Sequence, residues 1–540
     1  MNVLKRIDRA LSVKNESGWN RNVSSRWSNK DLDPVPENQR TWSAWDLASY
    51  WSSDQLAPAT WDLGSTLVGL GLCAREAIPL SFVAFFAIGI MLTINGNIGA
   101  TTHCSFPVIA RSSFGMVGAY LPILVRSILA LLWLVILTYQ GGAVVSVMIR
   151  AIWPSFGDIK NTLPEHLGIT TQNMIGFVLL WLVQAPLACV PVRRLSIFFT
   201  IKAYTSIILF GGLFIWALVV TKGQGFLLTG SFDDSKVPLG SRSWAMVAGL
   251  NGVTGLYSTV EINIPDFSRF AKNRRASWVQ ILAVPITGTF PIATSFLCAQ
   301  AAQQAYGVTI FDPASLCGAF GSRAAQFFSA FGFFLATISV NLSANSISFA
   351  TDITSLFPRY LTIFRCSILA GVLCWATCPW KIVTDAPTFY NFLSSYPVFL
   401  APVACIIATD FFLVKKGKVD VRQFYEPHGV YSYFYGFNLR AIAAWICAFA
   451  PNLPSFAHAI DPTNPDVEPY TYFMSWYFST VTACFWYYLF SRVFPAHSSF
   501  VEEAVYEVGT LDYTDDGEAA VGVEKEEEDD KDLAATVAAV

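Results

Sequence analysis

Long apolar segments separated by short polar loops fill most of the chain. A membrane-spanning helix needs about 20 mostly apolar residues in a row, and twelve segments satisfy this pattern. Their predicted ranges are 48–72, 78–98, 117–150, 173–192, 196–220, 243–263, 277–302, 323–351, 364–380, 387–414, 437–452 and 470–493. The pattern predicts an all-α polytopic membrane protein with twelve transmembrane helices.

Polar residues interrupt the segment 323–351, which contains SVNLSAN from Ser339 to Asn345. At about 100° per residue, the serines and the asparagines Asn341 and Asn345 fall on nearly opposite stripes of a helix. Polar side chains inside a bilayer usually face protein or a water-filled path. The pattern therefore predicts either polar cavities beside this helix or hydrogen bonds to neighbouring helices.

Two other segments carry helix-breaking or ionisable residues. The first reads SYWSSDQLAPATWDLGSTLVGLGL, in which Ser52 and Ser53 come shortly before Pro58. Broken membrane helices are tolerated where their backbone lines a cavity or binds a substrate. Glu261, near the end of 243–263, is either a carboxyl that exchanges protons or a buried hydrogen-bonding group.

An aromatic and an amide lie two helical turns apart in the segment 117–150. Trp133 and Gln140 share one face of the predicted helix. A flat ring surface with an amide beside it suits a flat heterocycle, which needs stacking and directional hydrogen bonds. Packing of Trp133 in the protein core is the alternative.

Composition and charge support a membrane protein and narrow its class. Hydrophobic residues make up 54% of the chain and charged residues 14%, whereas soluble proteins carry about 25% charged residues. The sequence has no Gly-rich phosphate loop and no metal-ligand spacing of histidines, so we expect no ATP-driven pump, no enzyme, no metal or cofactor and no nucleic-acid partner. Basic residues concentrate in alternate loops, which predicts that both termini are cytoplasmic.

The two ends are predicted to be soluble tails, 1–45 and 495–540. The C-terminal tail contains VEKEEEDDKDL and is expected to be disordered. Lys525 and Lys531 within it resemble ubiquitylation signals, which predicts a ubiquitin ligase or endocytic adaptor as a partner. A tail that only provides solubility is the alternative.

Several motifs together resemble the nucleobase-cation-symport-1 family, in particular its fungal uracil, allantoin and uridine permease branch. These motifs include NKDLDPVPENQRTW (29–42), NIPDFSR after the segment 243–263, and DFFLVKKGKVDVRQFYEPHGVYSYFYGFN (410–438). The resemblance implies a LeuT-like fold with alternating access. It also implies two inverted five-helix repeats, expected at 46–222 and 242–415, and two extra helices at 436–494.

The resemblance also implies site residues. Trp133 and Tyr257 match the aromatic pair of the family, and Asn345 with its neighbour Asn341 matches the substrate-binding asparagines. Ser52 and Gln140 complete the expected substrate site. The expected cation-site residues are Ser53, Leu56, Ala336 and Ser339, and the expected gate residues are Phe392 and Tyr396. Glu261 stands where the family usually has a small apolar residue, and it is expected to couple protons because a buried carboxyl can exchange them.

Two departures from the family pattern change the expected chemistry. Leu137 stands where the family usually has a glutamine, which predicts fewer hydrogen bonds to the substrate. Val340 stands where a hydroxyl is common in the sodium site, and a hard cation needs several oxygen ligands. Protons are therefore favoured over sodium.

The predicted function is import of a nucleobase-related heterocycle by a proton-coupled symporter in the plasma membrane. A vitamin-type substrate, such as thiamine, pyridoxine or nicotinamide riboside, is the alternative within the family. A substrate sensor that does not transport is the alternative outside it.

Overall fold

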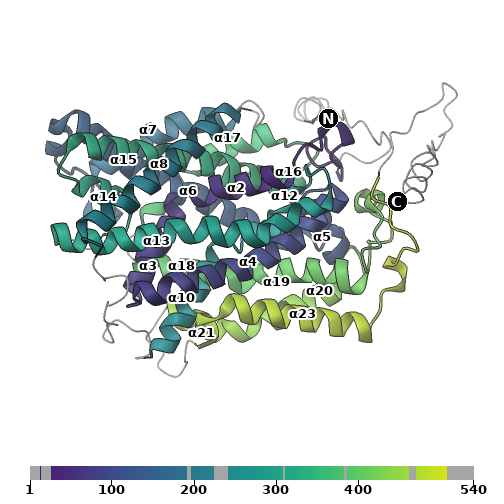
Figure 1. Ribbon diagram of the computed structural model, residues 1–540. Helices are drawn as coiled ribbons and strands as arrows, with labels where there is room; N and C mark the ends of the chain where they lie inside the picture. Colours follow the sequence, from purple (N-terminus) through teal and green to yellow (C-terminus); the bar gives the residue numbers. More distant parts are fainter. Residues whose placement is uncertain are drawn as a thin grey trace, which may run out of the picture.

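The structure is a computed structural model that describes residues 12–13, 26–190, 196–223, 241–307, 310–381, 386–460 and 470–507. These residues form helices and turns, and no strand occurs among them. The long helices lie side by side in one bundle (Figure 1). Seven helices in the described ranges are long and apolar enough to cross a membrane. The all-α membrane architecture is thereby confirmed, whereas the count of twelve spans stays a prediction.

Five predicted spans form single long helices. These are α4 (Ala74–Thr102), α6 (Tyr120–Ile152), α7 (Thr171–Ala188), α8 (Ser196–Val220) and α13 (Gln280–Tyr306). The lipid-facing character of α8 is clear from its exposed apolar side chains, among them Ile201, Ile208 and Val219.

Four other predicted spans are interrupted. They form α2 and α3 (Ala44–Gln55, Pro58–Gly69), α10, α11 and α12 (Arg242–Leu256, Val260–Asn263, Pro265–Ser268), α15 and α16 (Arg323–Val340, Ile347–Leu356), and α18 and α19 (Ala386–Ser395, Pro397–Thr409). The remaining three correspond to α17 (Ile363–Leu373), α20 (Leu439–Phe449), and α22 with α23 (Tyr470–Phe473, Ser475–Val493). Short helices α5 (Phe106–Phe114), α14 (Pro313–Ala319) and α21 (Leu453–Ile460) lie between spans.

Proline chemistry explains the break between α2 and α3. Pro58 is the first residue of α3 and has no N–H to continue the hydrogen bonding of α2. Ala57 before it is extended, with φ −147° and ψ 162°, as expected for a residue that precedes proline. The span therefore crosses the bundle as two half-helices.

Close packing fixes these half-helices against their neighbours. Helix α13 packs along both α3 and α4. A Cβ atom at Gly64 would lie 2.6 Å from the carbonyl oxygen of Ile292, which shows how closely α3 approaches α13. Larger side chains at this position would push the two helices apart.

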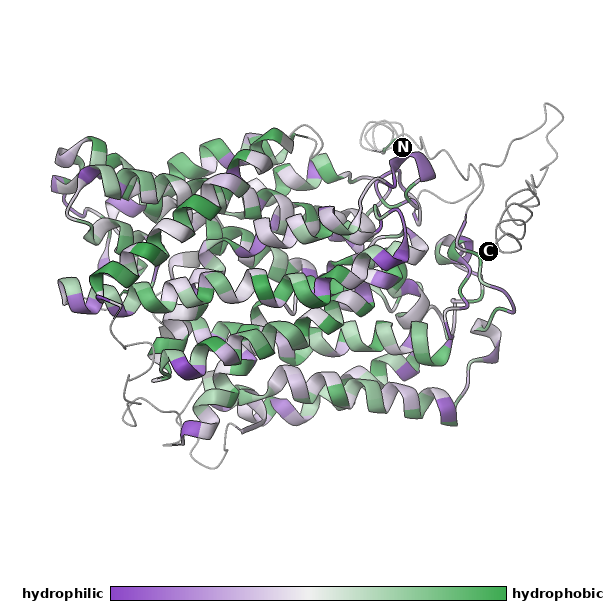
Figure 2. Ribbon diagram, viewed as in Figure 1, coloured by the Kyte–Doolittle hydropathy of each residue, from purple (hydrophilic) through white to green (hydrophobic). Residues whose placement is uncertain are grey.

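Both described ends of the chain lie at the same end of the bundle (Figure 1). Arg40 Nη1 lies 2.7 Å from Glu507 Oε1, and Val421 N donates to Val505 O over 2.9 Å. Hydrophilic residues are most dense at this end, whereas apolar residues line the lengths of the helices (Figure 2). The predicted tail signals at Lys525 and Lys531 lie outside the described residues.

Residues 26–42 form a segment that we call the N-terminal strap. Asn29 Nδ2 donates to the carbonyl oxygens of Pro358 and Leu361, both over 2.9 Å. Trp42 N donates to Phe270 O over 2.8 Å. The strap thus ties the segment after α12 to the segment after α16.

Candidate functional site

A small cavity lies where the broken helices meet α6 and the end of α15. Its volume is about 40 Å³. It is lined by side chains from four parts of the chain, including Asp54, Trp133, Leu137, Tyr257, Val340 and Asn345. Three of the predicted substrate-binding residues, Trp133, Tyr257 and Asn345, therefore lie around one space.

The breaks in two helices place Tyr257 in this cavity. Helix α10 ends at Leu256, and α11 begins only at Val260. The Tyr257 hydroxyl lies 3.1 Å from Thr60 Oγ1 of α3, and its ring packs edge-on against Trp51 and Phe85. The hydroxyl contact joins the two broken spans at their discontinuities.

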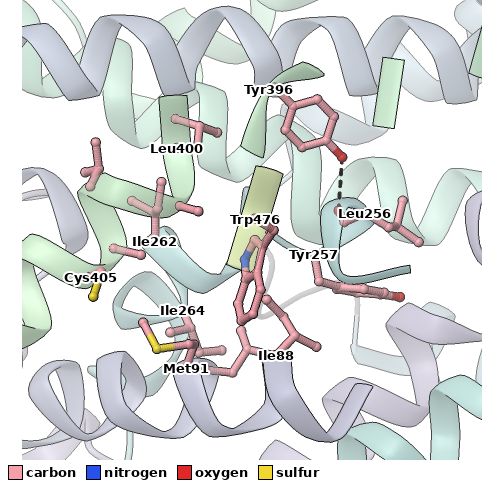
Figure 3. Packing of buried hydrophobic residues seen from close by; sticks show 14 of the residues in the cluster. Ile88, Met91, Leu256, Tyr257, Ile262, Ile264, Tyr396, Leu400, Cys405 and Trp476 are labelled. Carbon is pink, nitrogen blue, oxygen red and sulfur yellow. Dashed lines mark hydrogen bonds between the residues drawn. The ribbon is translucent and has the colours of Figure 1, made fainter. Parts of the chain in front are cut away.

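Trp133 of α6 forms an aromatic cluster with the predicted gate residues. Its ring centroid lies 5.4 Å from that of Phe392 and 6.4 Å from that of Tyr396. The Tyr396 hydroxyl donates to Leu256 O over 3.4 Å (Figure 3). Tyr396, which follows α18, thus contacts the break after α10, where Leu256 lines the cavity.

The polar stretch from Asn341 to Ser346 forms a π-helical turn between α15 and α16. Such turns often occur at functional sites, and this one brings Asn345 to the cavity. Asn345 Nδ2 donates to Asn341 Oδ1 over 2.8 Å. Asn341 itself lies behind the cavity wall and bonds to α6 and α7.

Besides Asn341, two further predicted substrate-binding residues lie outside the cavity lining. Ser52 Oγ donates to Ala48 O of its own helix over 3.1 Å. Gln140 Nε2 donates to the buried carboxyl of Asp62 on α3. Ser52 therefore bonds within its own helix, whereas Gln140 links α6 to α3.

The predicted cation site contains a positive side chain that sequence reasoning missed. Lys202 of α8 is fully buried, and its Nζ donates to Ser53 Oγ over 3.3 Å. Its charge also interacts with that of the Asp54 carboxylate. The signal was present in the sequence, because Lys202 is the one charged residue within the apolar range 196–220.

The other predicted cation-site residues offer few side-chain oxygens. Leu56, Ala336 and Val340 have none, so only their backbone carbonyls are available as ligands. Ser339 is buried, and its hydroxyl has no hydrogen-bond partner in the described part of the chain. Among the described residues there is also no group of three or more His, Cys, Asp or Glu that could hold a metal ion.

Glu261 lies apart from both places. It is fully buried on α11, and both of its carboxylate oxygens accept from Trp476 Nε1, over 3.1 and 3.2 Å. Trp476 lies among apolar side chains such as Ile262 and Met91 (Figure 3). The structure thus gives Glu261 a partner on α23, outside the cavity.

A further buried ion pair lies between α6 and α16. The guanidinium of Arg126 contacts the carboxylate of Asp352, and both side chains are almost inaccessible to solvent. Nearby, Asn263 Nδ2 donates to Ser348 Oγ over 2.5 Å. These contacts connect α16 both to α6 and to the broken span that holds Tyr257.

Residues 34–477 match the sequence pattern of a protein family. That family is described as "permease for cytosine/purines, uracil, thiamine, allantoin". The chain belongs to this permease family. The permease is also 33% identical over 454 residues to the allantoin permease of Saccharomyces cerevisiae, covering 81% of this chain and 71% of that protein. Its identity to the uracil permease of the same yeast is 30% over 443 residues, covering 79% and 69%.

The fold is similar to that of Mhp1, a nucleobase-cation-symport-1 family transporter. A closed conformation with bromovinylhydantoin bound superposes with a TM-score of 0.65 at 19% sequence identity, covering 88% of this chain and 98% of Mhp1. The inward-facing conformation gives a TM-score of 0.68. These findings confirm the predicted family and LeuT-like fold, and they identify the permease as a transporter and not an enzyme.

Proposed function

We propose that the permease imports a nucleobase-related heterocycle, such as uracil, allantoin or uridine, together with protons by alternating access. One observation carries this proposal: Trp133, Tyr257 and Asn345 line a single cavity at the helix breaks. Aromatic faces stack on flat rings, and an amide adds directional hydrogen bonds. The permeases named above support the same substrate class.

Lys202 favours protons over sodium as the coupled ion. A sodium ion beside Ser53 would lie close to the Lys202 ammonium, which donates to the same oxygen. Two unit charges about 4 Å apart repel by roughly 4 kcal/mol near a protein surface. The acidic and basic groups of Asp54 and Lys202 instead offer a place where a proton can be taken up and released.

The aromatic cluster supports a gating role for Phe392 and Tyr396. A cavity of about 40 Å³ is far smaller than ligand pockets, which have volumes of roughly 300–1,000 Å³. Entry of a heterocycle therefore requires side chains around the cavity to move, and the rings of Phe392 and Tyr396 beside Trp133 are the proposed moving part. Their return would then enclose the substrate.

Location and turnover complete the proposal. The positive-inside pattern supports cytoplasmic termini, and we place the permease in the plasma membrane. Ubiquitylation at Lys525 or Lys531 would control its removal from that membrane.

Uptake by cells that lack their own permeases tests the proposed function. Labelled uracil, allantoin and uridine should be accumulated, with competition by purines, hydantoins and vitamins ranking the substrates. A protonophore should abolish accumulation, whereas replacement of sodium should leave it unchanged. Sodium-dependent uptake, or no uptake of any heterocycle, would contradict the proposal.

Trp133→Ala tests the cavity itself. Stacking of a base on an aromatic ring contributes roughly 1–3 kcal/mol, so KM should rise about tenfold to a hundredfold. Trp153→Ala is the matched control, because Trp153 is 62% exposed and follows the end of the same helix.

A further inference from the structure

Behind the cavity wall, Thr138 of α6, Gln184 of α7 and Asn341 form a buried group of polar side chains that we call the amide relay. None of the three lines the cavity that holds Trp133. Gln184 Nε2 donates to Thr138 Oγ1 over 2.9 Å, and Asn341 Nδ2 lies 2.9 Å from Gln184 Oε1. The relay ends at Asn345, through its contact with Asn341.

We propose that the amide relay fixes the side-chain amide of Asn345 so that its carbonyl oxygen faces the cavity. The site would then select heterocycles that present a ring N–H at this edge. Thr138, Gln184 and Asn341 would be positioning residues that determine specificity without touching the substrate. This inference rests on the proposed function, since it concerns how the same cavity reads its substrate.

The direction of the relay is set by a backbone carbonyl. Leu134 O can only accept, and it receives the Thr138 hydroxyl over 2.6 Å and Asn341 Nδ2 over 3.1 Å. Because Thr138 donates to Leu134, its oxygen remains free to accept from Gln184 Nε2. The carbonyl end of Gln184 then faces Asn341 Nδ2, which confirms the same orientation of Asn341 from a second side.

That orientation leaves only one arrangement for Asn345. Asn341 presents its Oδ1, so Asn345 must offer its Nδ2, as the 2.8 Å contact between these atoms indicates. A turn of the Asn345 amide by 180° would place two carbonyl oxygens against each other and lose this hydrogen bond. In the described part of the chain, no group donates to Asn345 Oδ1, which leaves this acceptor available to a substrate.

A hydrogen-bond acceptor at the cavity wall favours a substrate that presents a donor there and disfavours one that presents another acceptor. A site built around a hydrogen bond discriminates strongly against an analogue that cannot make it, because the polar group of the protein is left unpaired. Lactam and imide rings carry the required N–H. Analogues with N–CH₃ or a ring oxygen at that position should bind at least about tenfold more weakly.

Competition against labelled substrate, with the full-length permease in cells, tests the inference. The probes are uracil and hydantoin, each with its N-methyl and ring-oxygen analogues. In the wild type, replacing the N–H at one ring position of each parent compound should weaken competition about tenfold. In Asn341→Leu, Asn345 loses the oxygen that holds its Nδ2 and is free to turn, so the penalty for the ring-oxygen analogue should shrink to about threefold or less. In Gln184→Met, Asn341 keeps its bond to Leu134 O, so the penalty should shrink less.

Two further variants distinguish a change in the orientation of Asn345 from a general loss of packing in the buried region. Ser367→Ala alters the same buried region and should keep the wild-type penalty, because the hydroxyl of Ser367 bonds within the described residues to Ile363 O of its own helix. Gln184→Glu keeps an acceptor oxygen for Asn341 and should restore the penalty. A steric effect of the analogue alone would be equal in all variants.

Each outcome decides the inference. A wild-type penalty that shrinks in Asn341→Leu but not in Ser367→Ala supports it. Substrate binding by the wild type without any penalty at a ring N–H, or with a penalty unchanged in Asn341→Leu, overturns the inference and leaves the proposed function intact. No competition by any heterocycle overturns both.

Discussion

At the scale of single residues, a buried ammonium is the least expected feature of the site. Moving a charged group out of water costs several kcal/mol unless it is paired and hydrogen-bonded. Lys202 is fully buried, and its compensation comes from Ser53 Oγ and the charge of Asp54. Such a pair is retained at a cost in stability, which is typical of functional groups in membrane helices.

Lys202→Met should uncouple uptake from the proton gradient. Loss of the ammonium removes the charge that acts on the buried Asp54 carboxyl, and a buried acid without an opposite charge nearby holds its proton more firmly. Labelled substrate should still equilibrate and exchange across the membrane, but accumulation should be lost. Ser206→Ala, at a buried position one turn further along α8, should accumulate substrate normally. Full proton-driven accumulation by Lys202→Met would exclude a coupling role.

Leu137→Gln should strengthen binding of uracil. Leu137 lines the cavity beside Trp133, and a glutamine there can add one hydrogen bond, worth about 1 kcal/mol. The expected fall in KM for uracil is about fivefold. Leu137→Met has similar size and no amide, and should leave KM unchanged. Equal effects of both variants would show that side-chain shape, and not hydrogen bonding, limits uracil affinity.

At the scale of elements, discontinuous helices build the site. The half-helix α3 begins at Pro58, and the break after α10 releases Tyr257 from helical geometry. The contact between Thr60 and Tyr257 then joins the two discontinuities. The proposed substrate site therefore depends on helices that stop inside the bundle.

Pro58→Ala should weaken substrate binding by allowing α2 and α3 to approach one continuous helix. Proline inside a helix costs about 3 kcal/mol, and removal of this penalty favours the continuous form by up to about a hundredfold. A matching loss of affinity is expected in equilibrium binding to purified protein. Pro313→Ala, also at the first position of a helix but away from the cavity, should bind as the wild type does. Unchanged affinity in Pro58→Ala would mean that other contacts hold the break.

Spans could be predicted from sequence because apolar length is a local property. The predicted range 196–220 matches α8, and 117–150 matches α6 to within a few residues. Interruptions were harder, since the end of α10 at Leu256 and the π-helical turn after α15 depend on contacts with other helices. Trp133, Tyr257 and Asn345 could be predicted because family motifs mark them. The contact of Lys202 with Ser53 could not, because it joins positions 149 residues apart.

At the scale of the whole molecule, the N-terminal strap connects parts of the bundle that are distant in sequence. Tyr425 donates to Leu32 O over 2.8 Å, and Arg111 donates to Trp27 O over 2.9 Å. With the contacts of Asn29 and Trp42, the strap bonds to several separate segments at one end of the bundle. Opening of the bundle at that end requires these bonds to break or to move together.

Asn29→Ala should destabilise the permease more than loss of the ion pair between Arg40 and Glu507. Asn29 is buried and bonds to two carbonyls, so its loss should cost about 2 kcal/mol. Glu507→Gln should cost less than about 1 kcal/mol, because its side chain is 70% exposed. Melting temperatures in detergent should therefore rank wild type, Glu507→Gln and Asn29→Ala in descending order. The reverse order of the two variants would show that the ion pair holds the strap.

The pairing of Asp54 with Lys202 also has a consequence for membrane voltage. As a carboxylate and an ammonium, the two charges cancel, so the empty carrier would return without moving net charge. Under the proposed proton coupling, binding of a proton adds one positive charge to the loaded carrier, and one charge that crosses 100 mV gains about 2.3 kcal/mol. An inside-negative potassium diffusion potential imposed on proteoliposomes should therefore accelerate substrate entry and leave the return of the empty carrier unaffected.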